Sequence, residues 1–328
     1  MKLFNKFTET IFYKNYSELE KQIDILKKLN KKYPDNKKIA LRLKLAELGL
    51  QGEKQIEFEL KNANIGMYVL HDVNICIDDL KAQIDYIIIT PAYTYFVECK
   101  NLIGNIIVNE RGEFIREYTY NGKKYKEGIY SPLRQATRHI EVYKKIWQSQ
   151  HNPIFQKIFG NNFDKWNKPL VVLANNKSVI DTRKAPKDIK NKIVRSDYLI
   201  NLIKKDISKC NKEYINTKDE MEKIAYKIMA NYHREINNNY KEEFMQLIDS
   251  FNNEVEEKEA IKNDLLTFRK NKSKEKNIPA YYIFTDKELE KIIEFMPKTK
   301  EQLRFLNILP KVKLNLHGED IINIISKK

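Results

Sequence analysis

Three side chains that could perform hydrolytic chemistry lie close together in the segment QIDYIIITPAYTYFVECKN. Asp85 is followed after twelve residues by Glu98, and Lys100 comes two residues later. Two carboxylates provide the hard oxygen ligands that Mg²⁺ binds, and Mn²⁺ accepts the same ligands. A lysine beside the ion could orient or help deprotonate an attacking water, while the ion neutralises charge on a phosphate. The residue types therefore suit metal-dependent hydrolysis of a phosphate ester.

Both carboxylates are expected on β-strands that lie side by side. The runs 83–90 and 94–100 are rich in β-branched and aromatic residues, and only a short connection separates them. Side chains of a strand alternate between its two faces, so Glu98 and Lys100 should point to the same side. A tight connection would then bring Asp85 alongside Glu98.

An exposed charge pair is the alternative interpretation of Glu98 and Lys100, because such pairs at a spacing of two are common on solvated strands. The neighbouring residues argue for a buried position instead. Charges in a central strand cost desolvation energy unless they are paired or bind a metal. Positions that carry this cost are often functional. The apolar neighbours are Ile87, Ile88, Ile89, Phe96 and Val97.

The surrounding elements predict a mixed α/β arrangement. The first fifty residues read as helix, with a capping box from Ser17 to Glu20 and a break near Gly49 and Gly52 before a further helix. Lys123, Lys124 and Lys126 are expected in a solvated loop. Strands are expected at 67–75, 83–90, 94–100 and 169–174, a hairpin at 104–109 and 113–120, and helices from Ser131-Pro132 to about Gln150 and near 185–205.

Composition favours a polyanionic partner. The chain has 60 basic and 45 acidic residues, a formal net charge of +15, which favours binding to nucleic acid. The sequence contains no run of eighteen apolar residues, so it predicts no membrane-spanning helix. Residues 1–14 could form an amphipathic helix, docked on the protein itself rather than on a membrane surface. Cys76, Cys99 and Cys210 are too few and scattered for a disulfide framework, so we expect a reducing, cytoplasmic environment.

Four segments of the chain resemble the NERD (nuclease-related) domain, a branch of the PD-(D/E)xK restriction-endonuclease-like superfamily. They occur in the family's order within residues 52–150, and 169–174 fits the last core strand. The resemblance implies an α/β fold with a restriction-endonuclease-like αβββαβ core. The segments are GEKQIEFEL at 52–60, QIDYIIIT at 83–90, VECKNLIGNI at 97–106 and YSPLRQATRHI at 130–140.

The resemblance assigns metal ligands residue by residue. Asp85 matches the family's metal-bridging aspartate, and Glu98 matches the second acidic ligand. The backbone carbonyl of Cys99 is a further implied ligand, since its side chain points to the opposite layer. Lys100 matches the superfamily's lysine, which serves the chemical step.

Two supporting residues come from helices. Glu53 matches the acidic residue of the first core helix, and Glu57, one turn later, could take that role instead. Gln135 matches the polar residue of the second core helix. His139 shares a face with Gln135, but it is expected to be a packed or surface histidine rather than a ligand.

The C-terminal segment 265–327 resembles an HRDC domain, the helical module shared by RecQ-type helicases and RNase D. Capping boxes from Thr285 and Thr299 open its short helices. The resemblance implies nucleic-acid binding or recruitment of a helicase. The turn at 307–310 lacks the glycine that would let a phosphate approach the backbone closely. Three aromatic residues, Tyr281, Tyr282 and Phe284, are expected in the core of this segment rather than stacking on bases. The other residues on which the resemblance rests are Leu266, Arg269, Pro279, Leu289, Pro297, Leu303 and Gly318.

The sequence thus predicts a Mg²⁺-dependent nuclease that acts on DNA rather than RNA, with a possible helicase partner. The alternative is a non-catalytic nucleic-acid-binding or helicase-recruiting adaptor on a nuclease-like fold. The segment from 261 to 328 carries fifteen basic and nine acidic residues, a net charge of +6. The predicted organisation is an N-terminal helical segment at 1–50, the NERD domain at 51–205, a helical connector at 206–260 and the HRDC-like domain at 261–328.

Overall fold

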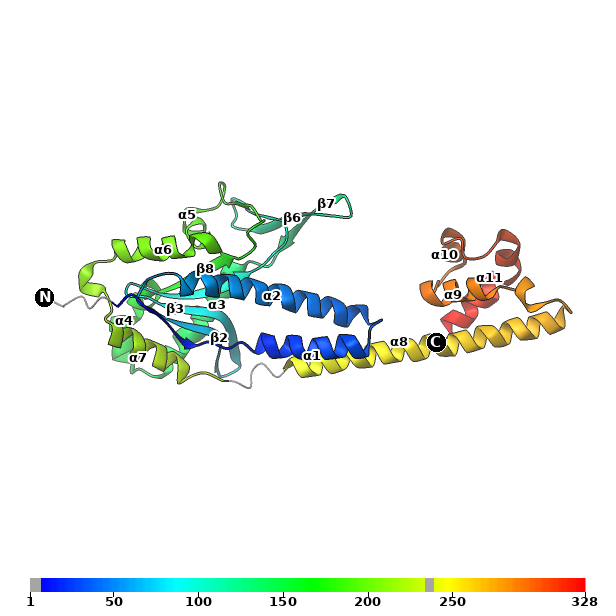
Figure 1. Cartoon of the computed structure of the whole chain (residues 1–328), viewed down its shortest axis with the longest axis horizontal. Helices are drawn as coiled ribbons and strands as arrows, with labels where there is room; N and C mark the ends of the chain where they lie inside the picture. Colours follow the sequence, from blue (N-terminus) through cyan, green and yellow to red (C-terminus); the bar gives the residue numbers. More distant parts are fainter. Residues whose placement is uncertain (1–6, 234–238, 328) are drawn as a thin grey trace. The chain divides into compact units, whose positions relative to one another are not determined.

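A computed structural model describes residues 7–233 and 239–327 of the chain (Figure 1). The chain divides into two compact units, Met1–Tyr240 and Lys241–Lys328. The first unit is mixed α/β and the second is helical, which confirms the predicted fold class. Each unit has its own buried core.

A mixed six-stranded sheet forms the centre of the first unit. Strands β2, β3 and β4 form an antiparallel meander, whereas β1, β8 and β10 pair in parallel with their neighbours. The predicted strands at the centre of the sheet are therefore confirmed. The sheet runs in the order β1 (Thr10–Lys14), β2 (Met67–Ile77), β3 (Leu80–Ile89), β4 (Thr94–Lys100), β8 (Asn167–Leu173) and β10 (Ile193–Arg195).

Helices cover both faces of this sheet because its strands are apolar on both sides. In β3, Ile87 and Ile89 pack toward one set of helices, while Tyr86 and Ile88 pack toward the other. A sheet buried on both faces reads as a continuous hydrophobic run rather than an alternating one. One face carries α3 (Pro132–Ser149), α4 (Pro153–Trp166) and α7 (Lys218–Met229); the other carries α2 (Lys37–Lys61) and α6 (Ser196–Lys209) (Figure 1).

The chain order α2, β2, β3, β4, α3 and β8 contains the expected αβββαβ core, with α4 placed before β8. Strands β5 (Asn105–Val108), β6 (Phe114–Tyr120) and β7 (Lys123–Ile129), inserted between β4 and α3, form a second, smaller sheet with β9 (Ile180–Asp181), which follows β8. The inner residues of this sheet, including Ile106 and Phe114, pack against Leu133 of α3 and Val171 of β8. This sheet runs in the order β7, β6, β5 and β9.

Several local expectations were wrong. Residues 10–14 form strand β1 instead of an amphipathic helix, and residues 1–6 of that expectation lie outside the described residues. Helix α2 continues through Gly49 and Gly52 without a break. The basic run of Lys123, Lys124 and Lys126 belongs to strand β7 rather than a loop. The helix expected near 185–205 is divided into α5 (Lys187–Lys190), β10 and α6.

Helix α1 (Glu18–Lys32) starts at Ser17, whose side chain accepts a hydrogen bond from the Leu19 amide. It packs on α2 and extends the first unit beyond the expected core. Helix α7 lies in the segment expected to be a connector. Its buried residues Met221, Ala225 and Ile228 belong to the core beneath the central sheet.

The second unit contains α8 (Asn239–Glu275) from its third residue onward, α9 (Asp286–Phe295), α10 (Lys300–Phe305) and α11 (Lys311–Ser326). Thr285 forms the predicted capping box with Glu288, and Thr299 caps α10. Ile261 and Leu265 of α8 contribute to the core of this unit. The core also contains Phe284, Leu289, Ile292, Leu303, Leu314 and Ile321.

Two tyrosines of this unit are not in the core, contrary to expectation. Tyr281 and Tyr282 are 58% and 57% exposed, and their rings stack with centroids 4.8 Å apart. Phe284 is fully buried, as expected. The parts of the two rings that do not face each other are therefore exposed.

Candidate active site

Asp85 and Glu98 meet where β3 and β4 stop pairing. The ladder between these strands ends at the pair Tyr86 and Val97. Just beyond it, the Cys99 amide donates a 2.6 Å hydrogen bond to Asp85 Oδ2. The Asp85 carboxylate thus accepts the hydrogen bond of the Cys99 amide at the point where the pairing of β3 and β4 ends. The two acidic residues are brought together as the sequence predicted.

Lys100 lies on the same face of β4 as Glu98 and reaches toward helix α3. Its Nζ donates to Glu98 Oε1 at 2.5 Å and to Gln135 Oε1 at 3.3 Å. The alternation of the strand sends the Cys99 side chain to the other face, where it packs with the apolar core beneath α2. The ammonium group therefore lies among the candidate residues rather than in solvent.

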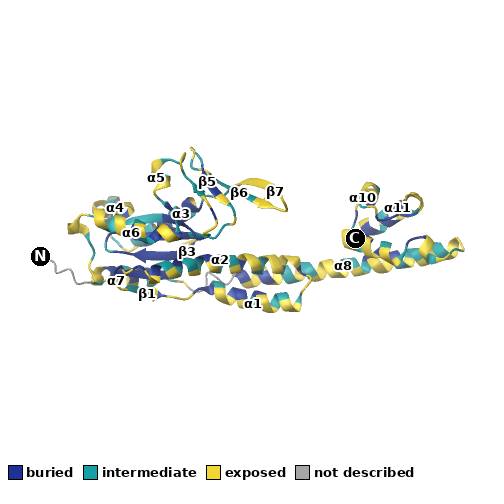
Figure 2. Ribbon diagram, turned by 45° about the horizontal axis from the view of Figure 1, so that its top comes forward, coloured by how far each residue is buried: buried dark blue, intermediate teal, exposed yellow. Residues whose placement is uncertain are grey.

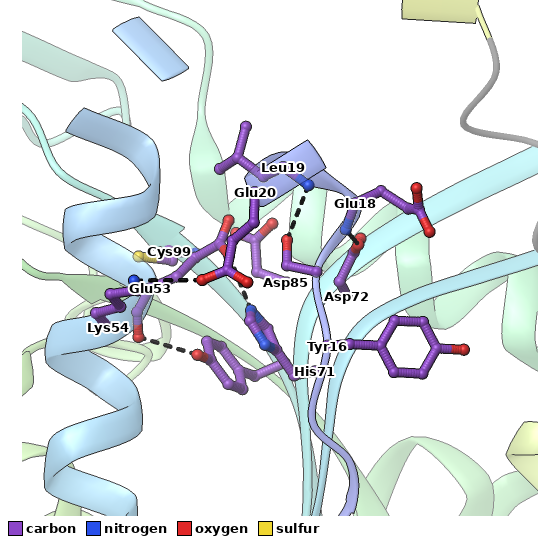
Figure 3. A network of polar contacts seen from close by, with 12 residues as sticks. Tyr16, Glu18, Leu19, Glu20, Glu53, Lys54, His71, Asp72, Asp85 and Cys99 are labelled. Atoms are coloured by element: carbon purple, nitrogen blue, oxygen red, sulfur yellow. Dashed lines mark hydrogen bonds and ion pairs between the residues drawn. The ribbon is translucent and has the colours of Figure 1, made fainter. Parts of the chain in front are cut away.

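Helix α2 brings Glu53 to the site because Gly52 allows close packing. A Cβ atom at Gly52 would lie 2.8 Å from Asn101 Cβ and 3.2 Å from Cys99 Sγ. His71 Nε2 lies 2.8 Å from Glu53 Oε2, and the ring of His71 stacks on Tyr86 (Figure 3). The Tyr86 hydroxyl donates to the Glu53 carbonyl. Glu53 is therefore held at this position by contacts from two strands.

Glu57, the alternative to Glu53, forms an ion pair with Lys61 at 2.6 Å. It does not line the pocket that contains the other candidate residues. This pocket has a volume of about 390 Å³. Its lining comprises Gly49, Glu53, Lys81, Ala82, Gln83, Asp85, Glu98, Cys99, Lys100, Asn101, Gln135 and His139. A larger hollow, near β8 and β10, contains none of the predicted site residues.

Electrostatics in the pocket favour binding of a cation. Burial raises the pKa of Asp85 well above its ordinary value, and the negative charges of Glu98 and Glu53 raise it further. Burial also raises the pKa of Glu98, although Lys100 opposes this effect. Burial alone would lower the pKa of Lys100, but the charge of Glu98 and its hydrogen bond raise it. One ammonium group is thus shared among several carboxylates.

His139 extends from α3 toward Glu98. Its Nδ1 lies 4.0 Å from Glu98 Oε2, and both atoms are buried without a hydrogen-bond partner in the described part of the chain. Burial, with a contribution from Lys100, lowers the pKa of His139 to about 4. The imidazole is therefore neutral at neutral pH, and this contact is not an ion pair. His139 lines the same pocket as the carboxylates.

The donor set fits a hard divalent cation that retains some of its waters. Across residues 7–233 and 239–327, no three His, Cys, Asp or Glu side chains form a ready-made metal cage. Mg²⁺ commonly binds through only one or two carboxylates plus waters and substrate phosphates. Asp85 and the unpaired Oε2 of Glu98 meet that requirement. We call Glu53, Asp85, Glu98, Lys100 and Gln135 the carboxylate site.

A second polar cluster beside this site was missed from the sequence. Buried Lys14 donates to the carbonyls of Tyr16, His71 and Asp72 at 2.6–2.8 Å. Asp72 Oδ2 accepts from the Glu18 amide (Figure 3). Asp72 Oδ1 accepts from the Gln83 side chain. The signal was present, because the pair His71-Asp72 interrupts the apolar strand MYVLHDVNICI. We call Lys14, Glu18, His71, Asp72 and Gln83 the Lys14 cluster.

Comparison with protein-family models gave two matches. Residues 48–174 match the NERD nuclease-related domain, and residues 258–325 match the HRDC domain. The chain combines a nuclease-related domain with an HRDC domain. Comparison with curated proteins and with solved structures gave no match.

The nuclease-related match contains every residue of the carboxylate site, from Glu53 to Gln135. It ends at the close of strand β8. Strand β1 and helices α1, α6 and α7 lie outside the match, although all four pack on the matched core. In the part of the chain that the structure describes, no helix combines the length and apolarity needed to cross a membrane.

Proposed function

We propose that this chain is a Mg²⁺-dependent nuclease that hydrolyses phosphodiester bonds in DNA, with Mn²⁺ as an alternative ion. One observation carries the proposal. Asp85 and Glu98 meet at the ends of adjacent strands with raised pKa values, and Lys100 lies on the same strand face. A pair of buried carboxylates whose charges are only partly compensated is costly by itself, and a bound cation would offset that cost.

We assign a separate chemical role to each residue of the carboxylate site. Asp85, Glu98 and the Cys99 carbonyl would hold the ion. When bound, Mg²⁺ supplies Lewis acidity at the phosphate and increases the acidity of water. Lys100, held by Glu98 and Gln135, orients the attacking water and stabilises negative charge on the phosphate.

Glu53 and Gln135 support this arrangement from opposite faces of the sheet. Glu53 adds negative charge near Asp85, which strengthens cation binding. Gln135 accepts a hydrogen bond from Lys100 through Oε1, so its amide nitrogen can donate to a phosphate oxygen.

The HRDC unit supports nucleic acid as the substrate. Its stacked, exposed tyrosines Tyr281 and Tyr282 offer flat faces to unpaired bases. Lys313 beside them is occupied by Glu288 and by the Tyr281 carbonyl, whereas Lys311 at the start of α11 is exposed. The net charge of +15 adds affinity that falls with salt.

A cleavage assay tests the proposal directly. The full chain is incubated with duplex DNA, single-stranded DNA and RNA, each with Mg²⁺, with Mn²⁺ and with EDTA. We expect metal-dependent cleavage of DNA and none with EDTA. Absence of cleavage of every substrate with both metals would contradict the proposal.

An adaptor function is the second candidate, and the HRDC unit gives it specific support. Phe305 is 89% exposed, and Val312 and Leu316 on α11 are 69% and 58% exposed. Exposed apolar side chains of this size suit a protein partner such as a helicase. Normal binding of nucleic acid and of a helicase by a chain that cleaves nothing would favour this function.

The contribution of the HRDC unit is tested by truncation. Because Ile261 and Leu265 of α8 belong to its core, the cut should follow Tyr240 rather than residue 260. We expect residues 1–240 to cleave with an unchanged maximal rate and a weaker affinity for DNA. Loss of the maximal rate in a folded truncation would contradict a purely binding role.

A further inference from the structure

A two-stranded β-ribbon lies between the catalytic elements of the first unit. It consists of β6 and β7, residues 114–129, and we call it the β6–β7 arm. At its base, residues 114–117 of β6 also pair with β5, so the arm is two-stranded only beyond Glu117. Strand β5 and the arm follow Lys100 along the chain, and the arm leads directly into α3, which carries Gln135. Both ends of the arm are thus continuous with the carboxylate site.

The distal part of the arm is exposed on both faces (Figure 2). Tyr120 is 62% exposed and Tyr125 is 41% exposed. A two-stranded ribbon without a core is marginally stable by itself, so local contacts must maintain it. Burial of apolar surface therefore does not explain why this ribbon extends so far from its sheet.

Local contacts make the arm stiff. Asn121 and Gly122 form its turn, and both have positive φ, the geometry that matches the twist of a hairpin. The rings of Tyr118 and Tyr125 stack across the strands at 5.3 Å, and the Arg116 guanidinium lies 4.3 Å from the Tyr118 ring. These contacts hold the two strands together without a core beneath them.

The base of the arm is attached to the loop that follows Lys100. Arg116 Nε donates to the Ile103 carbonyl at 2.7 Å. Gly104 has φ +106°, and a Cβ there would lie 2.4 Å from the Glu117 carbonyl oxygen. These contacts hold the base of the arm against the loop that follows Lys100. Figure 1 shows β6 and β7 extending from the first unit.

The charges of the arm are arranged in two groups. At its base, Arg116 pairs with Glu127 and Lys126 pairs with Glu117. At the tip, Lys123 and Lys124 have no acidic partner among the described residues. Consecutive residues of a strand point to opposite faces, so these two ammonium groups extend to the two sides of the ribbon.

We infer that the β6–β7 arm binds in the major groove of double-stranded DNA and positions the duplex for the carboxylate site. A two-stranded ribbon fits a major groove, which is about 12 Å wide. Lysines on both sides of the ribbon can reach the phosphates on both walls of that groove. Tyr120 pairs across the strands with Lys123 and lies on the same face. The inference rests on the proposed nuclease function and specifies its substrate as a duplex.

Charge removal at the tip tests this inference in the full-length protein. Binding of a duplex and of one of its single strands is measured in EDTA, so cleavage plays no part. For the variant Lys123→Ala/Lys124→Ala, we expect the salt slope of duplex binding to fall by about 1.8, because two phosphate contacts are lost. When salt is raised from 50 to 200 mM, the duplex affinity of the wild type should therefore fall roughly tenfold more than that of the variant.

The control variant Lys223→Ala/Lys227→Ala removes the same charge from exposed positions on α7. The salt slope of duplex binding by this control variant should remain close to that of the wild type. The affinity of Lys123→Ala/Lys124→Ala for the single strand should also remain close to that of the wild type. The inference is overturned if the tip and control variants bind duplex equally well. Equal loss of duplex and single-strand affinity in the tip variant overturns it too.

A shortened arm provides a second measurement. Removing Thr119, Tyr120, Lys123 and Lys124 keeps Asn121-Gly122 as the turn and preserves the faces of the remaining pairs. Duplex affinity in EDTA should fall at least as far as in the lysine variant. Unchanged duplex affinity overturns the inference. Failure of the nuclease proposal would instead appear as no cleavage by any variant, with the binding results in EDTA unaffected.

Discussion

The Lys14 cluster and the carboxylate site lie on neighbouring strands of one sheet, and both place charges where water is largely excluded. Lys14 and Asp72 are each 3% exposed, and Glu98 is 2% exposed. Burial of an ionised group costs several kcal/mol unless partners compensate for it. The two clusters differ in how completely their buried charges have partners. This difference distinguishes a cluster that stabilises the fold from the proposed catalytic site.

In the Lys14 cluster the charges have partners. The Lys14 ammonium donates to three carbonyls, and both carboxylate oxygens of Asp72 accept hydrogen bonds. Burial still lowers the pKa of Lys14 to about 8, although Asp72 and Glu18 oppose that shift. These contacts join β1 and the start of α1 to β2, so the cluster stabilises the fold.

In the carboxylate site compensation is incomplete. Lys100 satisfies one oxygen of Glu98, and the other oxygen has no partner among the described residues. Asp85 accepts one backbone amide but lies near two further carboxylates. The contrast supports our proposal that the carboxylate site binds a cation.

Replacing Asp85 should give the largest separation between activity and stability. For Asp85→Asn we expect Mn²⁺ affinity to fall by about 100-fold or more, because even residues outside the ligand shell contribute 10- to 100-fold. Cleavage should be lost. The melting temperature in EDTA should stay equal or rise, since the variant removes a buried negative charge. Calorimetry and thermal melts would measure both effects, and equal Mn²⁺ binding by variant and wild type would contradict the metal assignment.

The same substitution predicts a change in pH dependence. The pKa of Asp85 is raised in the folded protein, so the folded state keeps this proton to higher pH than the unfolded state does. Its contribution to the free energy of unfolding is therefore greatest below the ordinary value of 3.8 and is lost as pH rises through the raised pKa. In EDTA, stability should fall less steeply over this range in Asp85→Asn. Identical pH profiles for variant and wild type would show that Asp85 is not perturbed.

Lys100→Ala should reduce cleavage by about 100- to 10,000-fold, the usual contribution of a proton-transfer group. Affinity for DNA should change little, because one of 60 basic residues is removed. Lys54→Ala is the matched control, since Lys54 forms an exposed pair with Glu20 one residue from Glu53. Cleavage rates and binding isotherms for both variants would decide the role. Undiminished cleavage by Lys100→Ala would leave the nuclease proposal resting on the carboxylates alone.

Local patterns predicted the site strands well. The alternation of β4 placed Glu98 and Lys100 on one face, and the short connection to β3 placed Asp85 beside them. These features depend on residues that are close in sequence, for which period and turn length are sufficient guides. The capping residues of the helical unit were predictable for the same reason.

Tertiary contacts decided what the sequence patterns missed. Gly52 suggested a helix break, but it is the position where α2 packs closely against Asn101 and Cys99. Residues 10–14 contain apolar and basic residues typical of an amphipathic helix, yet they pair with β2 as an edge strand. Lys14 could be recognised as buried only after that pairing was known. Long-range packing overrides local propensity in each case.

Lys14→Met should mainly affect stability, in contrast to Asp85→Asn. The variant leaves the buried carbonyls of His71 and Asp72 without their donor, which should lower the free energy of unfolding by about 2–4 kcal/mol. Denaturant titration would measure the loss, and cleavage per folded molecule should fall less than tenfold. A stable variant with lost cleavage would place Lys14 in the chemistry and remove the distinction between the clusters.

His71 belongs to both clusters and should show the smallest but most specific effect. Its carbonyl accepts from Lys14, and its ring holds Glu53 at 2.8 Å. His71→Ala should reduce metal affinity and maximal rate by about 10-fold, as expected for a residue that orients part of a metal site. His71→Gln can still donate to Glu53, so it should recover part of that loss at similar stability. If His71 had only a structural role, the activity of each variant would follow its melting temperature. Equal activity of His71→Ala and His71→Gln at unequal stability would contradict the positioning role.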